Sequence, residues 1–150
     1  MCGIAVIIAE GMTVPPELVE TVFRIIALRG TDACGAAYFQ PRRGWVWHKE
    51  TGSVLLQRNM DALVGRASEL RPKAALLHVR AATHGSPLDH NNNHPVFGEH
   101  SMLIHNGIAN IPKRYQSFGQ TDSEQMLRHL ENIGLERGIG TVTGSYAIGM

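Results

Sequence analysis

Cys2 carries the side chain of this sequence best suited to nucleophilic chemistry. If Met1 is removed, Cys2 holds a thiol and a free α-amine within one residue. The reference pKa is about 8.5 for a cysteine thiol and about 7.7–8.0 for an α-amine, so the amine can act as a base for the thiol near neutral pH. The alternative is a small apolar residue that begins a buried strand, and position alone favours that alternative.

Polar residues that end apolar segments form a second group of candidates. Arg80 ends one such segment, where a guanidinium can clamp a carboxylate or form a surface ion pair. Asn106 and Gly107 end another, where a side-chain amide and a backbone N–H can bind an oxyanion. Taken alone, however, an Asn-Gly pair favours a hairpin turn. Asp122 and Thr121 lie at the start of a predicted helix, where an N-cap is the simplest role for either residue.

Histidine is concentrated in the middle of the chain, which raises the question of a metal site. Six of the eight histidines lie between residues 78 and 105, namely His78, His84, His90, His94, His100 and His105. They lack the helical His-Glu-x-x-His spacing, and no cysteine pair accompanies them. We therefore expect no metal and no other cofactor, and we expect these histidines to crowd the loops at one sheet edge. Cys34 is expected to be a packed small residue rather than a second nucleophile.

Length and composition limit the class of protein. The 150 residues correspond to one ordinary domain, and 43% of them are hydrophobic, which is typical of a globular chain. The 14 basic and 13 acidic residues give no basic excess, so a nucleic-acid partner is not expected. No apolar stretch is long enough to predict a membrane span, and two cysteines do not make a disulfide framework. The N-terminus lacks the features of a signal peptide, and we expect a cytoplasmic protein.

The elements that must position these residues follow from apolar periodicity and turn residues. The pattern predicts helices over residues 16–28, 59–69 and 122–132. Gly134 lies just past the end of the last helix rather than within it. The pattern predicts a loop over residues 82–100. Strands are predicted over residues 3–9, 36–40, 44–49, 74–79, 102–105 and 142–148. Short strands with helices between them indicate a mixed α+β domain built on sheets.

Seven segments occur in an order that is specific to one family. They are residues 1–4, 29–35, 78–85, 92–95, 105–108, 121–124 and 144–147. On these segments the chain resembles the glutaminase domain of class II glutamine amidotransferases, a family of N-terminal-nucleophile hydrolases. The resemblance implies the four-layer α/β/β/α sandwich of those hydrolases, in a compact version. Val79 and Ala81 depart from it, because many members have Thr and Trp there.

The resemblance also implies a reaction and a nucleophile. Cys2 attacks the side-chain amide of L-glutamine, with its own α-amine as the base. The tetrahedral oxyanion lies against the Asn106 side chain and the Gly107 N–H. Ammonia leaves, and water hydrolyses the γ-glutamyl thioester to glutamate.

The same resemblance assigns residues to substrate binding. Arg80 binds the α-carboxylate of glutamine and Asp122 binds its α-ammonium. Thr83 and His84 match positions that line the same pocket. Arg29 matches an arginine beside the nucleophile, at a structural or gating position.

The expected partners are L-glutamine and a separate synthase or ligase subunit that receives the ammonia. We predict that residues 1–150 form one class II glutaminase domain without an acceptor domain. A compact stand-alone glutaminase and a piece truncated at its C-terminus both stay open, and we favour the first. Oligomerisation is left open too. Two other functions compete: an N-terminal-cysteine amidase acting on another amide, and a non-catalytic glutamine-sensing or regulatory module.

Overall fold

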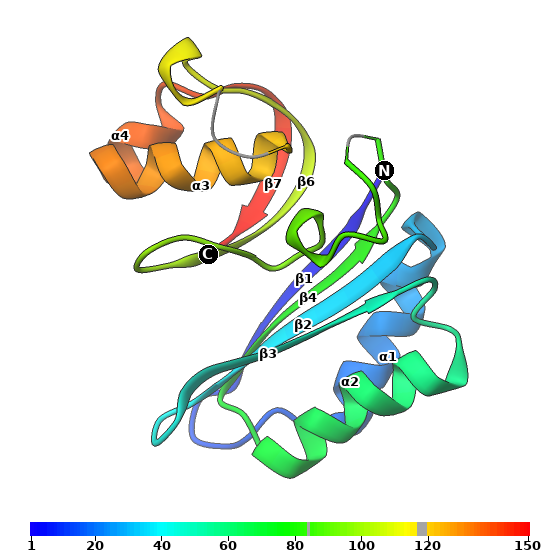
Figure 1. The fold of residues 1–150 in the computed structure, drawn as a ribbon. Helices are drawn as coiled ribbons and strands as arrows, with labels where there is room; N and C mark the ends of the chain where they lie inside the picture. The colour runs from blue at the N-terminus through cyan, green and yellow to red at the C-terminus, as the bar shows by residue number, and fades with distance from the viewer. Residues whose placement is uncertain (84, 117–119) are drawn as a thin grey trace.

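Two antiparallel sheets and the helices beside them make up the structure, a computed structural model that describes residues 1–83, 85–116 and 120–150 (Figure 1). The first sheet has the strand order β1-β4-β2-β3 and the second the order β5-β6-β7. The strands are β1 (Gly3–Ile8), β2 (Ala33–Gln40), β3 (Gly44–Thr51), β4 (Ala74–Arg80), β5 (Val96–Phe97), β6 (Met102–Asn110) and β7 (Thr143–Gly149). The helices are α1 (Pro16–Ile26), α2 (Gln57–Leu70), α3 (Asp122–Ile133) and α4 (Leu135–Ile139), with 3-10 turns at Ala27–Arg29, His90–Asn92 and Lys113–Tyr115.

The first sheet is covered on one face by α1 and α2 (Figure 1). Helix α1 places Val19 and Phe23 in the core, because apolar residues recur along it at helical spacing. Tyr38 of β2 is completely buried in the same cluster and donates a hydrogen bond to the Leu63 carbonyl over 2.8 Å. A buried tyrosine needs such a partner for its hydroxyl, which ties α2 to the sheet.

The second sheet packs against α3. Thr121 is the N-cap of this helix and forms a capping box with Glu124, which satisfies two backbone N–H groups at the helix start. Met126, Leu127 and Leu130 are buried on one side of α3, in the same core cluster as Leu103 of β6. The capping box therefore fixes where the helix begins, and Asp122 becomes its first residue.

The two sheets face each other across a small apolar cluster. Ala37 and Leu76 of the first sheet meet Ile104 of the second, and all three are buried. Strand β1 contacts both β6 and β7. This packing brings the ends of β1 and β4 next to the middle of β6, where the predicted site residues lie.

The prediction of a mixed α+β fold with many short strands is confirmed, and each predicted helix and strand is present. Two predictions were wrong. Asn106 and Gly107 do not end a strand, since β6 continues to Asn110 and pairs with β7, with Gly107 opposite Tyr146. The segment over residues 82–100 is not loop throughout, because it contains the short strand β5. Gly134 follows the end of α3 as predicted, and α4 begins directly after it. Among the described residues, no helix is long and apolar enough to cross a membrane.

Candidate active site

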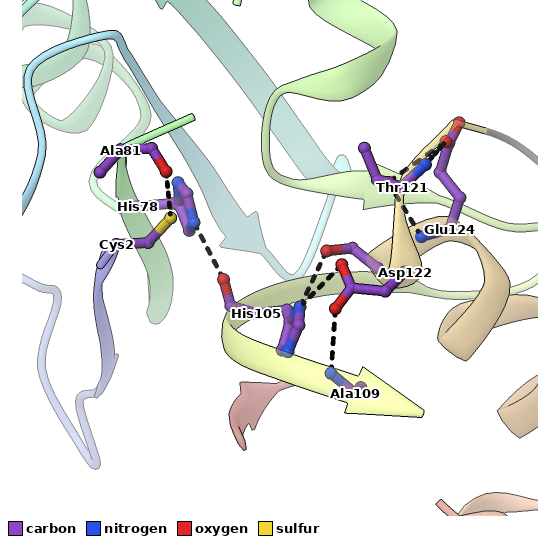
Figure 2. Close-up of polar contacts among 9 residues, drawn as sticks. Cys2, His78, Ala81, His105, Ala109, Thr121, Asp122 and Glu124 are labelled. Atoms are coloured by element: carbon purple, nitrogen blue, oxygen red, sulfur yellow. Dashed lines mark hydrogen bonds and ion pairs between the residues drawn. The ribbon is translucent and has the colours of Figure 1, made fainter. Parts of the chain in front are cut away.

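Cys2 lies where the start of β1 meets the end of β4. The antiparallel register pairs Gly3 with Val79, so the preceding Cys2 reaches the chain just beyond β4. Its thiol donates to the Ala81 carbonyl over 3.6 Å (Figure 2). Burial raises the pKa of the Cys2 thiol, although the nearby Arg80 guanidinium acts in the opposite direction. The thiol is therefore protonated at neutral pH, and its use as a nucleophile requires a base.

Arg29 holds the backbone of the nucleophile candidate. Its Nε donates to the Cys2 carbonyl oxygen over 2.9 Å, and its second nitrogen lies 3.8 Å from the Met1 sulfur. Because Arg29 ends the 3-10 turn after α1, this contact ties the N-terminus to the first helix.

Arg80 is buried at the end of β4 and is held from two sides. Its guanidinium donates to Asn93 Oδ1 over 2.8 Å and to the Gly85 carbonyl over 3.0 Å. Burial lowers the pKa of Arg80 from its ordinary value. The turn beyond Arg80 is held by Asp32, whose N–H donates to the Arg80 carbonyl over 2.9 Å and whose carboxylate accepts from the Ala82 N–H over 2.8 Å.

Gly107 occupies a position that only glycine fits. Its φ is +129°, and a Cβ there would lie 2.2 Å from the Ser145 carbonyl oxygen of the neighbouring strand. Asn106 precedes it on β6, and its buried Oδ1 has no hydrogen-bond partner among the described residues. The two residues thus present a side-chain amide and a backbone group side by side.

Asp122 projects from the first turn of α3 toward β6. Its Oδ2 accepts a hydrogen bond from the Ala109 N–H over 3.0 Å, and its Oδ1 lies 3.9 Å from His105 Nδ1 (Figure 2). The His105 Nδ1 is also 2.9 Å from Ser123 Oγ. The carboxylate is about one-third exposed, with a side-chain accessibility of 31%. It is therefore anchored to the second sheet and still reaches solvent.

A polar cavity of about 40 Å³ joins most of these residues. Cys2, Arg80, Thr83, Gly107 and Asp122 all line it. A second cavity of about 250 Å³ adjoins it and shares Thr83, Gly107 and Asp122. The structure therefore brings five of the predicted site residues to one place. Asn106 instead lines a third cavity, of about 250 Å³, which shares Cys2, Thr83 and Gly107 with the first, and His84 lies outside the described residues.

Three of the clustered histidines are buried in the interior rather than crowded in loops at a sheet edge, which corrects the expectation. His78 of β4 stacks on His94 with ring centroids 4.0 Å apart, and His105 lies 6.4 Å from His94. His78 Nε2 is 3.1 Å from the His105 carbonyl oxygen (Figure 2). Burial lowers the pKa of His78 to about 3 and that of His94 well below its ordinary value. The sequence did not predict this stack, although the position of His78 within the otherwise apolar residues 74–79 indicated a buried histidine.

The stack is not a metal centre in this structure. Among residues 1–83, 85–116 and 120–150, no group of three histidine, cysteine or carboxylate side chains is arranged to hold a metal ion. Cys34 is buried in β2, and burial raises its pKa to about 12, so its thiol is unreactive as well as enclosed.

Comparison with known proteins identifies the family. The family model for class II glutamine amidotransferases matches residues 24–138, which is more than half of the chain. The chain belongs to the class II glutamine amidotransferases. As a member of that family it has the seven sequence segments, and residues from several of them line the polar cavity.

Curated relatives of this class II glutamine amidotransferase are much longer proteins. The glutamine–fructose-6-phosphate aminotransferase of Helicobacter pylori is 30% identical over 166 aligned residues, covering 99% of this chain and 27% of the relative. The enzymes of the same name from Salmonella paratyphi A and Escherichia coli strain K12 are 30% and 31% identical, covering 92% of this chain and 23% of each relative. The chain thus spans about a quarter of the length of these relatives.

Proposed function

We propose that this chain hydrolyses the side-chain amide of L-glutamine to glutamate and ammonia through a γ-glutamyl thioester on Cys2. The observation that carries the proposal is the position of Cys2 at the wall of the cavity that Arg80 and Asp122 also line. A cation and an anion beside a thiol suit a free amino acid, because its carboxylate and ammonium can be bound while its side chain reaches the sulfur.

The state of the Cys2 thiol supports an amine as the base. Burial keeps the thiol protonated, and no carboxylate or imidazole is hydrogen-bonded to its sulfur among the described residues. With Met1 removed, the α-amine of Cys2 itself takes the thiol proton and later passes it to the departing nitrogen. Removal of Met1 is therefore part of the proposal.

The oxyanion is assigned to Asn106 and Gly107. The attack of sulfur on the amide carbon places negative charge on the carbonyl oxygen, which needs hydrogen-bond donors already in position. The Asn106 amide and the Gly107 N–H are adjacent on β6, and pairing with β7 fixes both. The removal of one such donor costs roughly 100- to 1000-fold in kcat in comparable sites.

The fold and the family also support proposals about the fold type, the domain and the recipient of the ammonia. Two facing antiparallel sheets with helices beside each support a compact four-layer α/β/β/α sandwich, with residues 1–150 as one glutaminase domain. The relatives are named as glutamine–fructose-6-phosphate aminotransferases. For this chain we propose only that a separate synthase or ligase subunit receives the ammonia.

Intact-mass measurement and a glutaminase assay test the proposal together. We expect the purified protein to lack Met1 and to release glutamate from L-glutamine. The Cys2→Ala variant is expected to bind glutamine and to release none. The buried Cys34→Ala variant serves as the matched control and keeps its activity if it folds, as checked by circular dichroism.

Each other outcome identifies a different alternative. A retained Met1 with full activity would remove the α-amine from the mechanism. Activity on N-acylated amines but not on glutamine would indicate an amidase of another class. Tight glutamine binding without turnover in the processed protein would indicate a sensing module.

A further inference from the structure

Lys49 joins the edge strand β3 to the turn that precedes β5. Its Nζ donates a hydrogen bond to the His90 carbonyl oxygen over 2.9 Å. The same ammonium lies 4.9 Å from the ring centroid of Phe97 and 5.6 Å from that of Trp47. Those two rings contact each other, with centroids 4.8 Å apart. The carbonyl and the two rings therefore hold the end of the Lys49 side chain in place.

The segment that Lys49 holds leads directly to Arg80. The His90 carbonyl oxygen also accepts a hydrogen bond from the Asn93 N–H over 3.2 Å, so Lys49 and Asn93 share one acceptor. The buried Asn93 side chain accepts from Arg80 Nη1 over 2.8 Å and donates to the Pro87 carbonyl over 2.7 Å. Both ends of this amide are thus bonded, which fixes its orientation. A shift of the His90 carbonyl therefore reaches the Arg80 guanidinium through one residue, Asn93.

Hydrogen bonds within residues 85–93 make this segment move as a unit. Asp89 accepts from the Asn91 N–H over 2.9 Å, and Asn92 Nδ2 donates to the Ser86 carbonyl over 3.2 Å. The Gly85 carbonyl, at the start of the segment, accepts from Arg80 over 3.0 Å. The two ends of one internally bonded segment therefore hold the guanidinium, and Lys49 ties that segment to β3.

The charge of Lys49 also acts on the polar cavity. Burial is the main cause of the lowered pKa of His94, and the Lys49 ammonium adds to it. Because the His94 ring lines the polar cavity, the positive charge of Lys49 is felt there. Burial lowers the pKa of Lys49 itself to about 8, while Glu124 and Asp89 favour its charged form, so the side chain is mostly protonated at pH 7.

We infer that Lys49 is a positioning residue for Arg80 and so helps to select substrates that carry a free α-carboxylate. The inference rests on the proposed function, in which Arg80 binds the α-carboxylate of L-glutamine. Among the described residues that line the polar cavity, Lys49 is absent. It therefore acts through the turn and through its charge, without touching the substrate.

Loss of the Lys49 amine is expected to weaken substrate binding more than the chemical step. Lys49→Met keeps an unbranched apolar side chain and removes the donor and the charge. Because the α-carboxylate is remote from the scissile amide, KM for glutamine should rise about 5-fold or more, with kcat changed by less than about 2-fold. Lys49→Arg keeps a donor and a charge, so it should restore most of the loss in KM.

The test compares L-glutamine with 4-aminobutanamide, which is glutamine without its α-carboxylate. Ammonia release from each is measured on protein that lacks Met1, with high enzyme concentration for the poorer substrate. Lys49→Met should lower kcat/KM about 5-fold or more for glutamine and less than about 2-fold for 4-aminobutanamide, which offers Arg80 no carboxylate. Lys73→Met is the matched control, expected to alter neither value. Lys73 also donates to a backbone carbonyl, that of Met12 over 2.8 Å, but it precedes β4 at the end opposite Arg80.

Each other outcome counts against the inference. Equal losses for the two compounds would indicate a general structural effect and overturn it, as would an unchanged kcat/KM for glutamine. If circular dichroism shows that Lys49→Met does not fold, Phe97→Leu tests the same link, because it removes one of the two rings that hold the ammonium. A smaller loss confined to glutamine is then expected, and its absence would overturn the inference. These results leave the proposed function standing, whereas wild type that releases no ammonia from glutamine would overturn both.

Discussion

The imidazole rings of His78 and His94 stack between the two sheets, with centroids 4.0 Å apart and planes inclined by 23°. Both rings are buried, and burial lowers the pKa of each, so both are neutral in the folded protein. Protonation of either ring would place a charge among apolar neighbours and beside another imidazole. The stack therefore makes the contact between the sheets sensitive to pH.

Acid is expected to destabilise the protein through these histidines. Their folded pKa values lie below the unfolded value of about 6.5, so the unfolded chain binds more protons below that pH. The free energy of unfolding has its full value above about pH 6.5. Below that pH it falls by about 1 kcal/mol per histidine for each pH unit. Urea titrations from pH 8 to 5 measure this slope. His94→Phe is expected to reduce it, and the exposed His100→Gln is expected not to; equal slopes in all three proteins would contradict the argument.

Substitution of Asn106 is expected to slow the chemical step. Asn106→Ala removes the side-chain donor proposed for the oxyanion, so kcat for glutamine falls by about 100- to 1000-fold with little change in KM. Steady-state glutamate release over a range of glutamine concentrations separates the two constants. Asn110→Ala is the control, because Asn110 is exposed at the end of the same strand. A rise in KM with an unchanged kcat would move Asn106 from the oxyanion to substrate binding.

The charge of Asp122 is expected to matter for substrate affinity. Asp122→Asn keeps an acceptor for the Ala109 N–H and removes the charge that would face the α-ammonium. A hydrogen bond to a charged group contributes about 1.5–3 kcal/mol, so KM for glutamine rises about 10- to 100-fold. The exposed Asp61→Asn variant controls for the change in net charge. An unchanged KM for glutamine would mean that Asp122 does not bind the α-ammonium.

Arg29 is expected to act as a positioning residue. Its bond to the Cys2 carbonyl holds the nucleophile, and a small displacement of a reacting atom can cost on the order of 100-fold in rate. Arg29→Ala should therefore lower kcat more than it changes KM, and Arg29→Lys should restore part of kcat. Arg24→Ala is the control, because it removes an exposed ion pair with Glu20 and is expected to leave kcat unchanged. Equal losses in the Ala and Lys variants would argue against a role for the hydrogen bond to Cys2.

Glu131 should stabilise the hairpin between β5 and β6. Its carboxylate accepts backbone hydrogen bonds from Glu99, His100 and Ser101 over 2.9–3.0 Å. Burial raises its pKa, but these bonds outweigh burial and leave the pKa lowered. Glu131→Gln should cost about 1–3 kcal/mol of unfolding free energy at pH 7.

The matched control for this hairpin is Glu99→Gln, because Glu99 is exposed and pairs only loosely with Arg128 at 3.7 Å. We expect it to change stability by less than about 0.5 kcal/mol. Since a lowered carboxyl pKa gives stability that is lost in acid, the gap between wild type and Glu131→Gln should begin to narrow below about pH 4.3 and close as the pH falls through the lowered pKa of folded Glu131. A gap that does not narrow at all between pH 5 and pH 2 would mean that the carboxylate charge is not its source.

The sequence by itself determined the helices and strands and which side chains are available for catalysis and binding. Apolar periodicity predicted the three long helices and every strand except the short β5, because each depends on contacts within a short stretch of chain. The thiol of Cys2, the guanidinium of Arg80 and the carboxylate of Asp122 could be named from residue type and motif order alone.

Only the tertiary structure decided how these groups meet. Asn106 and Gly107 lie inside a strand because β7, more than thirty residues later, supplies partners that outweigh their preference for a turn. The histidine stack and the two cavities around Cys2 depend on how the two sheets face each other. Such contacts join residues far apart in the chain, and their geometry depends on packing rather than on local pattern.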